Sequence, residues 1–158
     1  MHVDSKTRPV PLHVLSGKEC CLVAAAAERR CIEVLTGLAQ SIEHLDLRGA
    51  AKLREVAAEE ARHLQDVLTF ERDLPWPKVL HLTRASMVAV LKRHLPALFA
   101  EDATRAASPD EAFASFRQLE HEAAHFYREL GTISGEPASR AFFCDLAERE
   151  GEHAKWFR

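Results

Sequence analysis

Glycine, tyrosine and runs of a single charge are all scarce in this sequence. Its 158 residues include six glycines and one tyrosine, and the formal net charge is −3. Without a run of Lys or Arg, nucleic acid is not an expected partner. No apolar run approaches the roughly 20 residues of a membrane-spanning helix, so no membrane partner is expected. The abundant residues are Ala, Leu, Glu and Arg, which favour helix throughout one domain.

Cysteine is too irregularly spaced to form a disulfide framework or a four-thiolate metal site. The four cysteines make no CxxC pair: Cys20, Cys21, Cys31 and Cys144. Reduced thiols in a cytoplasmic protein are therefore the favoured interpretation. The apolar stretch CCLVAAAA (20–27) follows Lys18 and Glu19 and precedes further charged residues. These flanks indicate the buried side of a helix rather than a signal peptide.

Capping residues and helix breakers predict two helical hairpins. Ser16 and Asp46 are predicted N-caps of the first two helices, the second of which ends near Arg72. SPDE (108–111) begins a third helix, with Ser at the cap and Pro at the first helical position. SGEP (134–137) precedes a fourth helix that is expected to run almost to the last residue. The single domain then has four segments: an irregular tail (1–14), a first hairpin (15–72), a crossover (73–107) and a second hairpin (108–158).

The crossover of about 35 residues is too long for a hairpin loop. Its apolar stretch (86–99) predicts a short helix that is kinked near Pro96. Two hairpins joined by one long crossover is the connection found in ferritin-like four-helix bundles. The expected fold class is therefore all-α: a ferritin-like antiparallel four-helix bundle with a short extra helix in the crossover.

Two Glu-x-x-His pairs occur at matching points of the two hairpins. One pair lies in AEEARHL (58–64) and the other in EREGEHA (148–154). When Glu28 is aligned with Glu120, the Glu of each pair follows 32 residues later in the first hairpin and 30 in the second. A lone Glu-x-x-His is a weak signal, but this repeat indicates one site formed by both hairpins.

Helical periodicity separates inward-facing pairs from a third Glu-x-x-His pair. Phe116 and Tyr127 share the apolar face of Glu120. Glu122 and His125 point nearly the opposite way, so this pair is predicted to be solvated surface. The same test places six polar residues within the apolar stripes of four helices: Glu28, Glu60, His63, Glu120, Glu150 and His153.

Four carboxylates inside an apolar core require compensating positive charge. Burying each one uncompensated costs several kcal/mol, and no Lys or Arg lies at the centre of these stripes. Two divalent cations would balance four carboxylates, and oxygen donors with a few imidazoles suit Fe(II) or Mn(II). We therefore expect two metal ions, iron first and manganese as the alternative. The expected roles are terminal Glu28 and Glu120, imidazole ligands His63 and His153, and bridging Glu60 and Glu150.

At these residues the sequence resembles the rubrerythrin and ferritin-like superfamily. The resemblance covers residues 18–72 and 108–158. It rests on AAAAERRCIEVLTGLA followed by EEARHL, and on FRQLEHEAAHFYREL followed by EREGEHAKWF. The order of Glu, ExxH, Glu and ExxH is kept, and so is the FY pair at Phe126 and Tyr127. The resemblance implies a di-iron carboxylate site in a helical bundle.

Several family features are missing from this chain. Ala123 stands where rubrerythrins often carry an additional Glu, and the cysteines cannot form their rubredoxin-type Fe(Cys)4 module. Ala61 stands where bacterioferritins carry a haem-ligating Met, so no haem is expected. Only five residues follow His153, so a fifth helix of the ferritin-cage kind is not expected.

Tyr127 and Cys31 lie near the expected ligands. Tyr127 shares a face with Glu120, and core packing is its favoured role. The alternative is a catalytic role, in which Tyr127 donates a hydrogen bond to a terminal carboxylate or to bound oxygen. Cys31 is one turn after Glu28 and could sense oxidation, although a buried, inert thiol is the favoured interpretation.

The expected function is two-electron redox chemistry on hydrogen peroxide or dioxygen. The sequence shows no second redox centre, so an external electron-donor protein is an expected partner. One alternative is iron binding and ferroxidase-linked storage, and another is an interaction module that has lost its metal. A homodimer or higher homo-oligomer is also expected, with the apolar crossover helix (86–99) as the contact.

Overall fold

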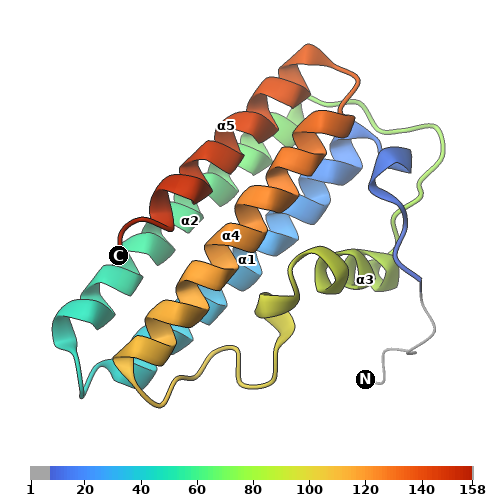
Figure 1. The fold of residues 1–158 in the computed structure, drawn as a ribbon. Coiled ribbons are helices and arrows are strands. Elements are labelled where there is room, and N and C mark those ends of the chain that lie inside the picture. The colour runs from blue at the N-terminus through green and yellow to red at the C-terminus, as the bar shows by residue number, and fades with distance from the viewer. Residues whose placement is uncertain (1–7, 158) are drawn as a thin grey trace.

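Five α-helices and no strand make up residues 8–157, which are the residues that the computed structural model describes. The helices are α1 (Gly17–Ile42), α2 (Leu47–Arg72), α3 (Arg84–His94), α4 (Pro109–Ile133) and α5 (Pro137–His153). Two short 3₁₀ segments, η1 (Leu12–Val14) and η2 (Pro96–Phe99), complete the fold. In the bundle, α1 packs along α2 and α4 along α5, as Figure 1 shows. The all-α prediction is confirmed.

The predicted N-caps are confirmed because each side chain accepts a backbone hydrogen bond. The Ser16 hydroxyl accepts from the N–H of Glu19, whose carboxylate accepts from the N–H of Ser16 in return. Asp46 caps α2 by accepting from the N–H of Gly49, and Ser108 caps α4 by accepting from the N–H of Glu111. Since four N–H groups at the start of a helix lack intrahelical partners, these caps define where the long helices begin.

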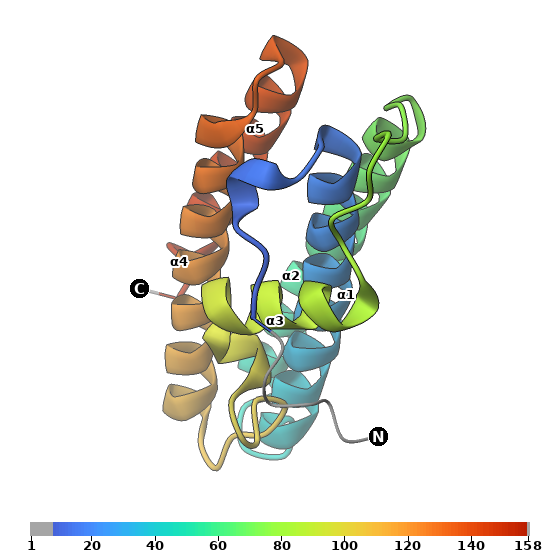
Figure 2. The same ribbon diagram turned by 90° about the vertical axis from the view of Figure 1, so that its right-hand side faces the viewer.

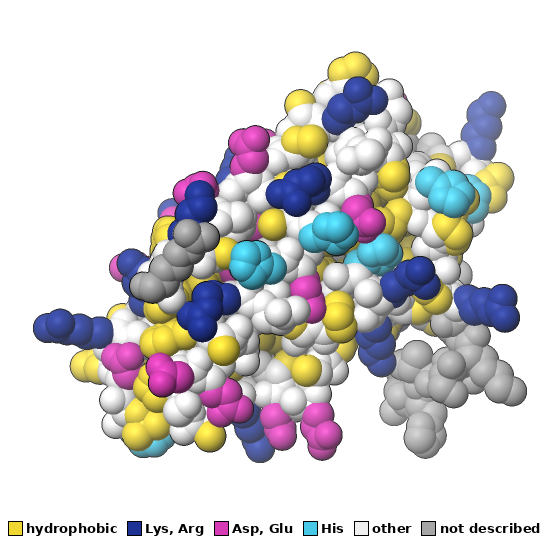
Figure 3. All heavy atoms as spheres, viewed as in Figure 1, with side chains coloured by type: hydrophobic (Ala, Val, Ile, Leu, Met, Phe, Trp, Pro, Cys, Tyr) yellow, Lys and Arg dark blue, Asp and Glu magenta, His cyan; other side chains and the backbone are white. Residues whose placement is uncertain are grey.

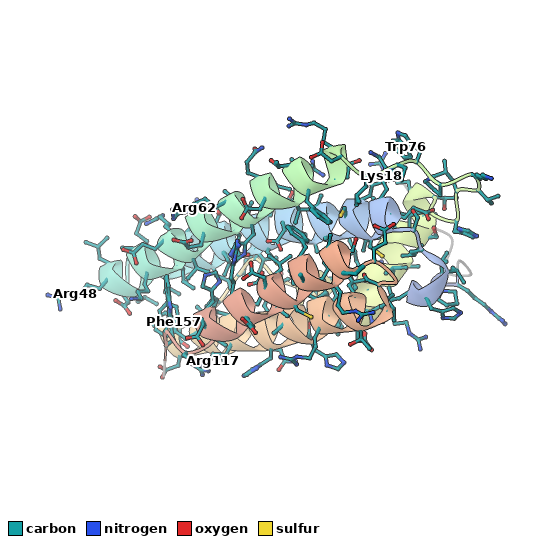
Figure 4. All side chains as sticks on the ribbon, turned by 90° about the horizontal axis from the view of Figure 1, so that it is seen from above. Lys18, Arg48, Arg62, Trp76, Arg117 and Phe157 are labelled. Carbon is teal, nitrogen blue, oxygen red and sulfur yellow. The ribbon has the colours of Figure 1, made fainter. Side chains whose placement is uncertain are left out.

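The predicted extent of the fourth helix is wrong, because α5 ends at His153 and a turn follows. The ring of Phe157 stacks on that of Phe113, with centroids 4.5 Å apart. The Arg117 guanidinium donates to the Phe157 carbonyl at 3.0 Å, and Figure 4 shows both residues toward the same end of the bundle. These contacts draw the last residues onto α4, away from the path that a continued helix would take.

The crossover lies across the face of the bundle that α1 and α4 form (Figures 1 and 2). Its helix breaks at Leu95, directly before Pro96, so the predicted kink is confirmed. The apolar side chains of this stretch are buried on their own bundle: Val90, Leu91, Leu95 and Leu98. The crossover helix therefore uses its apolar side within the chain.

Two buried charged residues of α1 fix the start of the crossover, which the sequence did not predict. The Glu19 carboxylate accepts from the backbone N–H of His81 and of Leu82, at 2.6 and 2.9 Å. Lys18 pairs with the Glu71 carboxylate at 3.0 Å and donates to the Glu71 carbonyl at 3.1 Å. Both charges are thus satisfied where the chain leaves α2.

The surface carries charges of both signs. On the face drawn in Figure 3, basic and acidic side chains are interspersed with single hydrophobic ones. Within residues 8–157, no helix is both long enough and apolar enough to cross a bilayer. All four cysteines are free thiols.

Gly37 of α1 provides a test of how closely the loop before α4 approaches the bundle. A Cβ at this position would lie 2.5 Å from the carbonyl oxygen of Thr104. Gly37→Ala should therefore lower the free energy of unfolding by about 1–3 kcal/mol, measured as a lower midpoint of urea unfolding. Gly151→Ala in α5 is the control, because its Cβ meets no described atom within 4 Å. The control should gain up to about 1 kcal/mol, and equal midpoints for the two variants would contradict the close approach.

Candidate metal centre

Four helices place buried polar side chains in the middle of the bundle. Each of these residues has an exposed fraction of 5% or less, and each lies among apolar neighbours. The structure brings together all of the residues predicted as metal ligands: Glu28 from α1, Glu60 and His63 from α2, Glu120 from α4, and Glu150 and His153 from α5. Burial of the six is a finding, whereas their role as ligands stays a prediction.

The two Glu-x-x-His pairs interlock across the bundle. Nδ1 of His63 lies 3.1 Å from Oε2 of Glu60 and 3.2 Å from Oε1 of Glu150. Nδ1 of His153 lies 3.0 Å from Oε1 of Glu60 and 3.5 Å from Oε2 of Glu150. The two imidazole rings are nearly parallel, with centroids 5.3 Å apart. Each of these two carboxylates therefore presents one oxygen to each histidine.

Glu28 and Glu120 flank this arrangement differently. Oε2 of Glu120 lies 3.4 Å from Nδ1 of His153. Oε1 of Glu28 accepts a short hydrogen bond from the hydroxyl of Tyr127, which is itself fully buried. Tyr127 thus packs in the core, as favoured, and also makes the carboxylate contact that was the alternative.

Protons can supply the positive charge that these carboxylates require. Burial, with repulsion from neighbouring carboxylates, raises the pKa of Glu28 and of Glu120 well above 4.5. Burial would also raise the pKa of Glu60, but the imidazoles of His153 and His63 outweigh it and lower the pKa to about 2. For the histidines burial opposes protonation, yet the facing carboxylates raise the pKa of His63 to about 9 and of His153 to about 12.

The geometry fits a metal ion better than a completed hydrogen-bond network. Six buried atoms of the predicted ligand residues lack a hydrogen-bond partner among residues 8–157: Oε2 of Glu28, Oε1 of Glu60, both oxygens of Glu120, Oε2 of Glu150 and Nδ1 of His153. Nδ1 of His153 is within 3.5 Å of three carboxylates but is aligned for a hydrogen bond with none. Such unpaired buried atoms are rare in proteins, and carboxylate oxygen with imidazole nitrogen is a common donor set for Fe, Mn and Zn.

One ligand atom from each member of the two pairs lies within 4.8 Å of the others. This buried cluster of four residues could hold a metal ion: Glu60, His63, Glu150 and His153. The described cysteines form no four-thiolate group.

The third Glu-x-x-His pair lies outside the cluster. The side chain of His125 is 71% exposed. Glu122 is half-buried, and its carboxylate accepts from the N–H of Ala97 at 2.9 Å and from the Gln118 amide at 3.0 Å. The prediction that this pair faces away from the core agrees with the structure, although the sequence did not predict the hydrogen bond from Ala97 of η2 to Glu122.

Trp156 is a residue of the site that the sequence did not reveal. Its ring meets that of His153 edge to face, with centroids 5.2 Å apart, and the Lys52 ammonium lies 4.9 Å from the Trp156 ring centroid. Trp156 lies three residues after His153, a spacing that places both side chains on the same side of a helical turn. The helical-phase test named Phe157 on this face but did not name Trp156. Cys31 is buried and burial raises the pKa of its thiol, in agreement with an inert thiol.

Comparison of this chain with models of protein families, with curated proteins and with solved structures finds no match. The fold and the site therefore define the class of protein: a helical bundle with a buried Glu/His cluster that could hold a metal ion. A more specific assignment of function depends on the geometry of the six predicted ligand residues.

The raised pKa values predict how stability of the metal-free protein depends on pH. A carboxyl whose pKa is raised by folding stabilises the fold at low pH and loses this contribution as pH rises above 4.5. The raised pKa of His63 acts in the same direction between 6.5 and about 9. After treatment with a chelator, the midpoint of urea unfolding should decrease as the pH is raised from 5 to 9. Each proton that the folded state holds in excess lowers the free energy of unfolding by up to about 1.4 kcal/mol per pH unit.

Glu120→Gln should flatten this fall, because it removes one of the groups that gains a proton on folding. The control is Glu148→Gln on the exposed side of α5, which should keep the wild-type slope. A wild-type midpoint that is constant or rises over this range would contradict the raised pKa values.

Proposed function

We propose that this chain is a ferritin-like, dinuclear metal-carboxylate protein of rubrerythrin-like type, with iron as its metal and manganese as the alternative. One observation carries the proposal: Glu60 and Glu150 each present one oxygen to His63 and the other to His153. Two carboxylates bridging two ions, each of which has its own imidazole, would require this arrangement.

The terminal ligands follow from the same contacts. Glu120 lies beside His153 and would share its ion, which leaves Glu28 to the ion of His63. The Tyr127 hydroxyl binds one oxygen of Glu28 and so orients that carboxylate. Six side chains serving two ions leave coordination positions open for a small oxygen-containing substrate.

The proposed activity is reduction of hydrogen peroxide, or of dioxygen, with electrons from an external donor protein. A pair of ferrous ions supplies two electrons, and converting one hydrogen peroxide to two waters consumes two electrons and two protons. The apolar residues around the six ligands exclude bulk water, and Trp156 covers the ring of His153. Among residues 8–157 the cysteines form no second iron site, which supports a separate electron donor.

Metal binding should displace the protons that balance the carboxylates. At pH 6.5 we expect two divalent ions to release at least two protons, since the pKa of His63 is raised to about 9 and that of His153 to about 12. Glu28 and Glu120, whose pKa values are also raised, add to this number. Calorimetric titration with Mn(II) in buffers of different ionisation enthalpy measures this number. Glu120→Gln should release fewer protons than the wild type, and release of less than one proton by the wild type would contradict the proposed exchange.

Loss of a bridging carboxylate should abolish metal binding and turnover together. Anaerobic titration with Fe(II) should show two ions per chain in the wild type and in Glu148→Ala, and less than one in Glu60→Ala. Removing the hydrogen-bond partner of a metal ligand lowers activity roughly 10- to 100-fold. Glu60→Ala removes a ligand itself, so its rate of peroxide consumption with a supplied electron donor should fall by more than this. Equal losses in the two variants would contradict the assignment of ligands.

Aerobic loading distinguishes this activity from iron storage. Retention of about two irons per chain after excess Fe(II) and oxygen supports a catalytic site. Retention of tens of irons per chain, without donor-dependent turnover of peroxide, would favour the storage alternative.

A further inference from the structure

We propose that a surface pocket between η1, α3 and α4 binds a small organic anion, a molecule that carries a carboxylate or phosphate on an apolar body. The pocket has a volume of about 580 Å³, which is within the usual range of small-molecule sites. It is lined by the segment from Pro9 to His13, the last turn of α3 and the second half of α4. It shares no residue with the metal centre, so the proposal stands independently of the proposed function.

Positive charge on the pocket wall selects for an anion. Arg93 from α3 and Arg128 from α4 both line the pocket. The acidic side chain of the lining, Glu129, contacts imidazoles: its Oε2 lies 3.2 Å from Nδ1 of His94 and its Oε1 lies 3.8 Å from Nε2 of His125. With neutral histidines the lining has a net positive charge. Since a guanidinium matches the geometry of carboxylate and phosphate, two of them favour an acidic head group.

Apolar side chains complete the pocket and select for an organic body. The pocket is lined by Val10 just before η1, by Leu12 of η1 and by Ile133 at the end of α4. His94, half-buried, lies against the ring of Phe126 with centroids 5.5 Å apart, so its position is fixed by the core. On the face drawn in Figure 3, histidine and basic side chains lie beside hydrophobic ones over α4 and toward η1. An inorganic ion would leave this apolar surface uncovered.

Neither helix capping nor a metal ion accounts for both arginines of the pocket. Arg93 lies in the last turn of α3, where a cation offsets the negative end of a helix. Arg128 has no such role, because it lies five residues before the end of α4 at Ile133. A metal ion held by the histidines and Glu129 would face two permanent positive charges nearby, which oppose it. An anionic ligand in the pocket would be attracted by both guanidinium groups, since both arginines line it.

Calorimetric titration of the purified protein with phenyl phosphate and with benzoate tests the proposal. We expect saturable binding of at least one of these probes, with one site per chain. Arg93→Met and Arg128→Met should each weaken it roughly tenfold, because each removes a charge-assisted hydrogen bond while keeping an apolar stem. Arg84→Met is the matched control: it removes the same charge from the exposed first residue of α3 and should leave the affinity unchanged.

Two further titrations separate the contribution of the ligand's charge from that of its apolar body. Benzyl alcohol has the apolar body without the charge, and inorganic phosphate has the charge without the body; both should bind at least tenfold more weakly than the better probe. Absence of saturable binding by both phenyl phosphate and benzoate would overturn the proposal. Unchanged affinity of the better probe for both Arg93→Met and Arg128→Met would also overturn it. Binding of benzyl alcohol or inorganic phosphate as tight as that of the better probe would have the same consequence.

Discussion

The structure depends on charge compensation, because four carboxylates and two imidazoles lie together in one apolar interior. Carboxylates removed from water are stable only when positive charge lies among them. In the metal-free chain protons have this role, as the raised pKa values of Glu28, Glu120, His63 and His153 indicate. Under the proposed function two divalent cations would replace those protons. The same requirement explains why all six side chains lie at one level of the bundle.

The site also explains how the two hairpins meet. One apolar core contains side chains of both hairpins, and Glu60, His63, Glu150 and His153 add polar contacts directly between α2 and α5. Elsewhere along these helices the rings of Phe70 and Phe142 stack at 4.3 Å, and Arg149 pairs with Asp66 at 2.8 Å on the surface. The hairpins are therefore joined by a shared apolar core and by specific contacts between α2 and α5 around a charged centre. A metal bound there would act as a link between them and would add its binding free energy to the stability of the fold.

Local and periodic features of the fold could be predicted from the sequence, because caps and apolar stripes act over one or two turns. Ser16, Asp46 and Ser108 begin helices as their capping chemistry indicates. Burial of the six polar residues followed from helical phase alone. What could not be predicted depends on contacts between distant segments, such as the packing of Phe157 on Phe113 that ends α5 early. The contact of Trp156 with His153 is different, because it is a local pair three residues apart that helical spacing could have indicated.

The repeat in the sequence does not produce two equivalent halves, and the difference has a chemical consequence. With Glu28 aligned on Glu120, the residue that corresponds to Tyr127 is Leu35, a buried apolar side chain. The Glu28 carboxylate is thus held by a phenol, whereas neither oxygen of Glu120 has a hydrogen-bond partner among the described residues. A hydrogen bond to a carboxylate fixes its orientation and draws off part of its negative charge. Under the proposed function the ion beside His153 would therefore meet the more basic and less constrained carboxylate, so the two metal positions would differ in affinity although the sequence repeats the ligands.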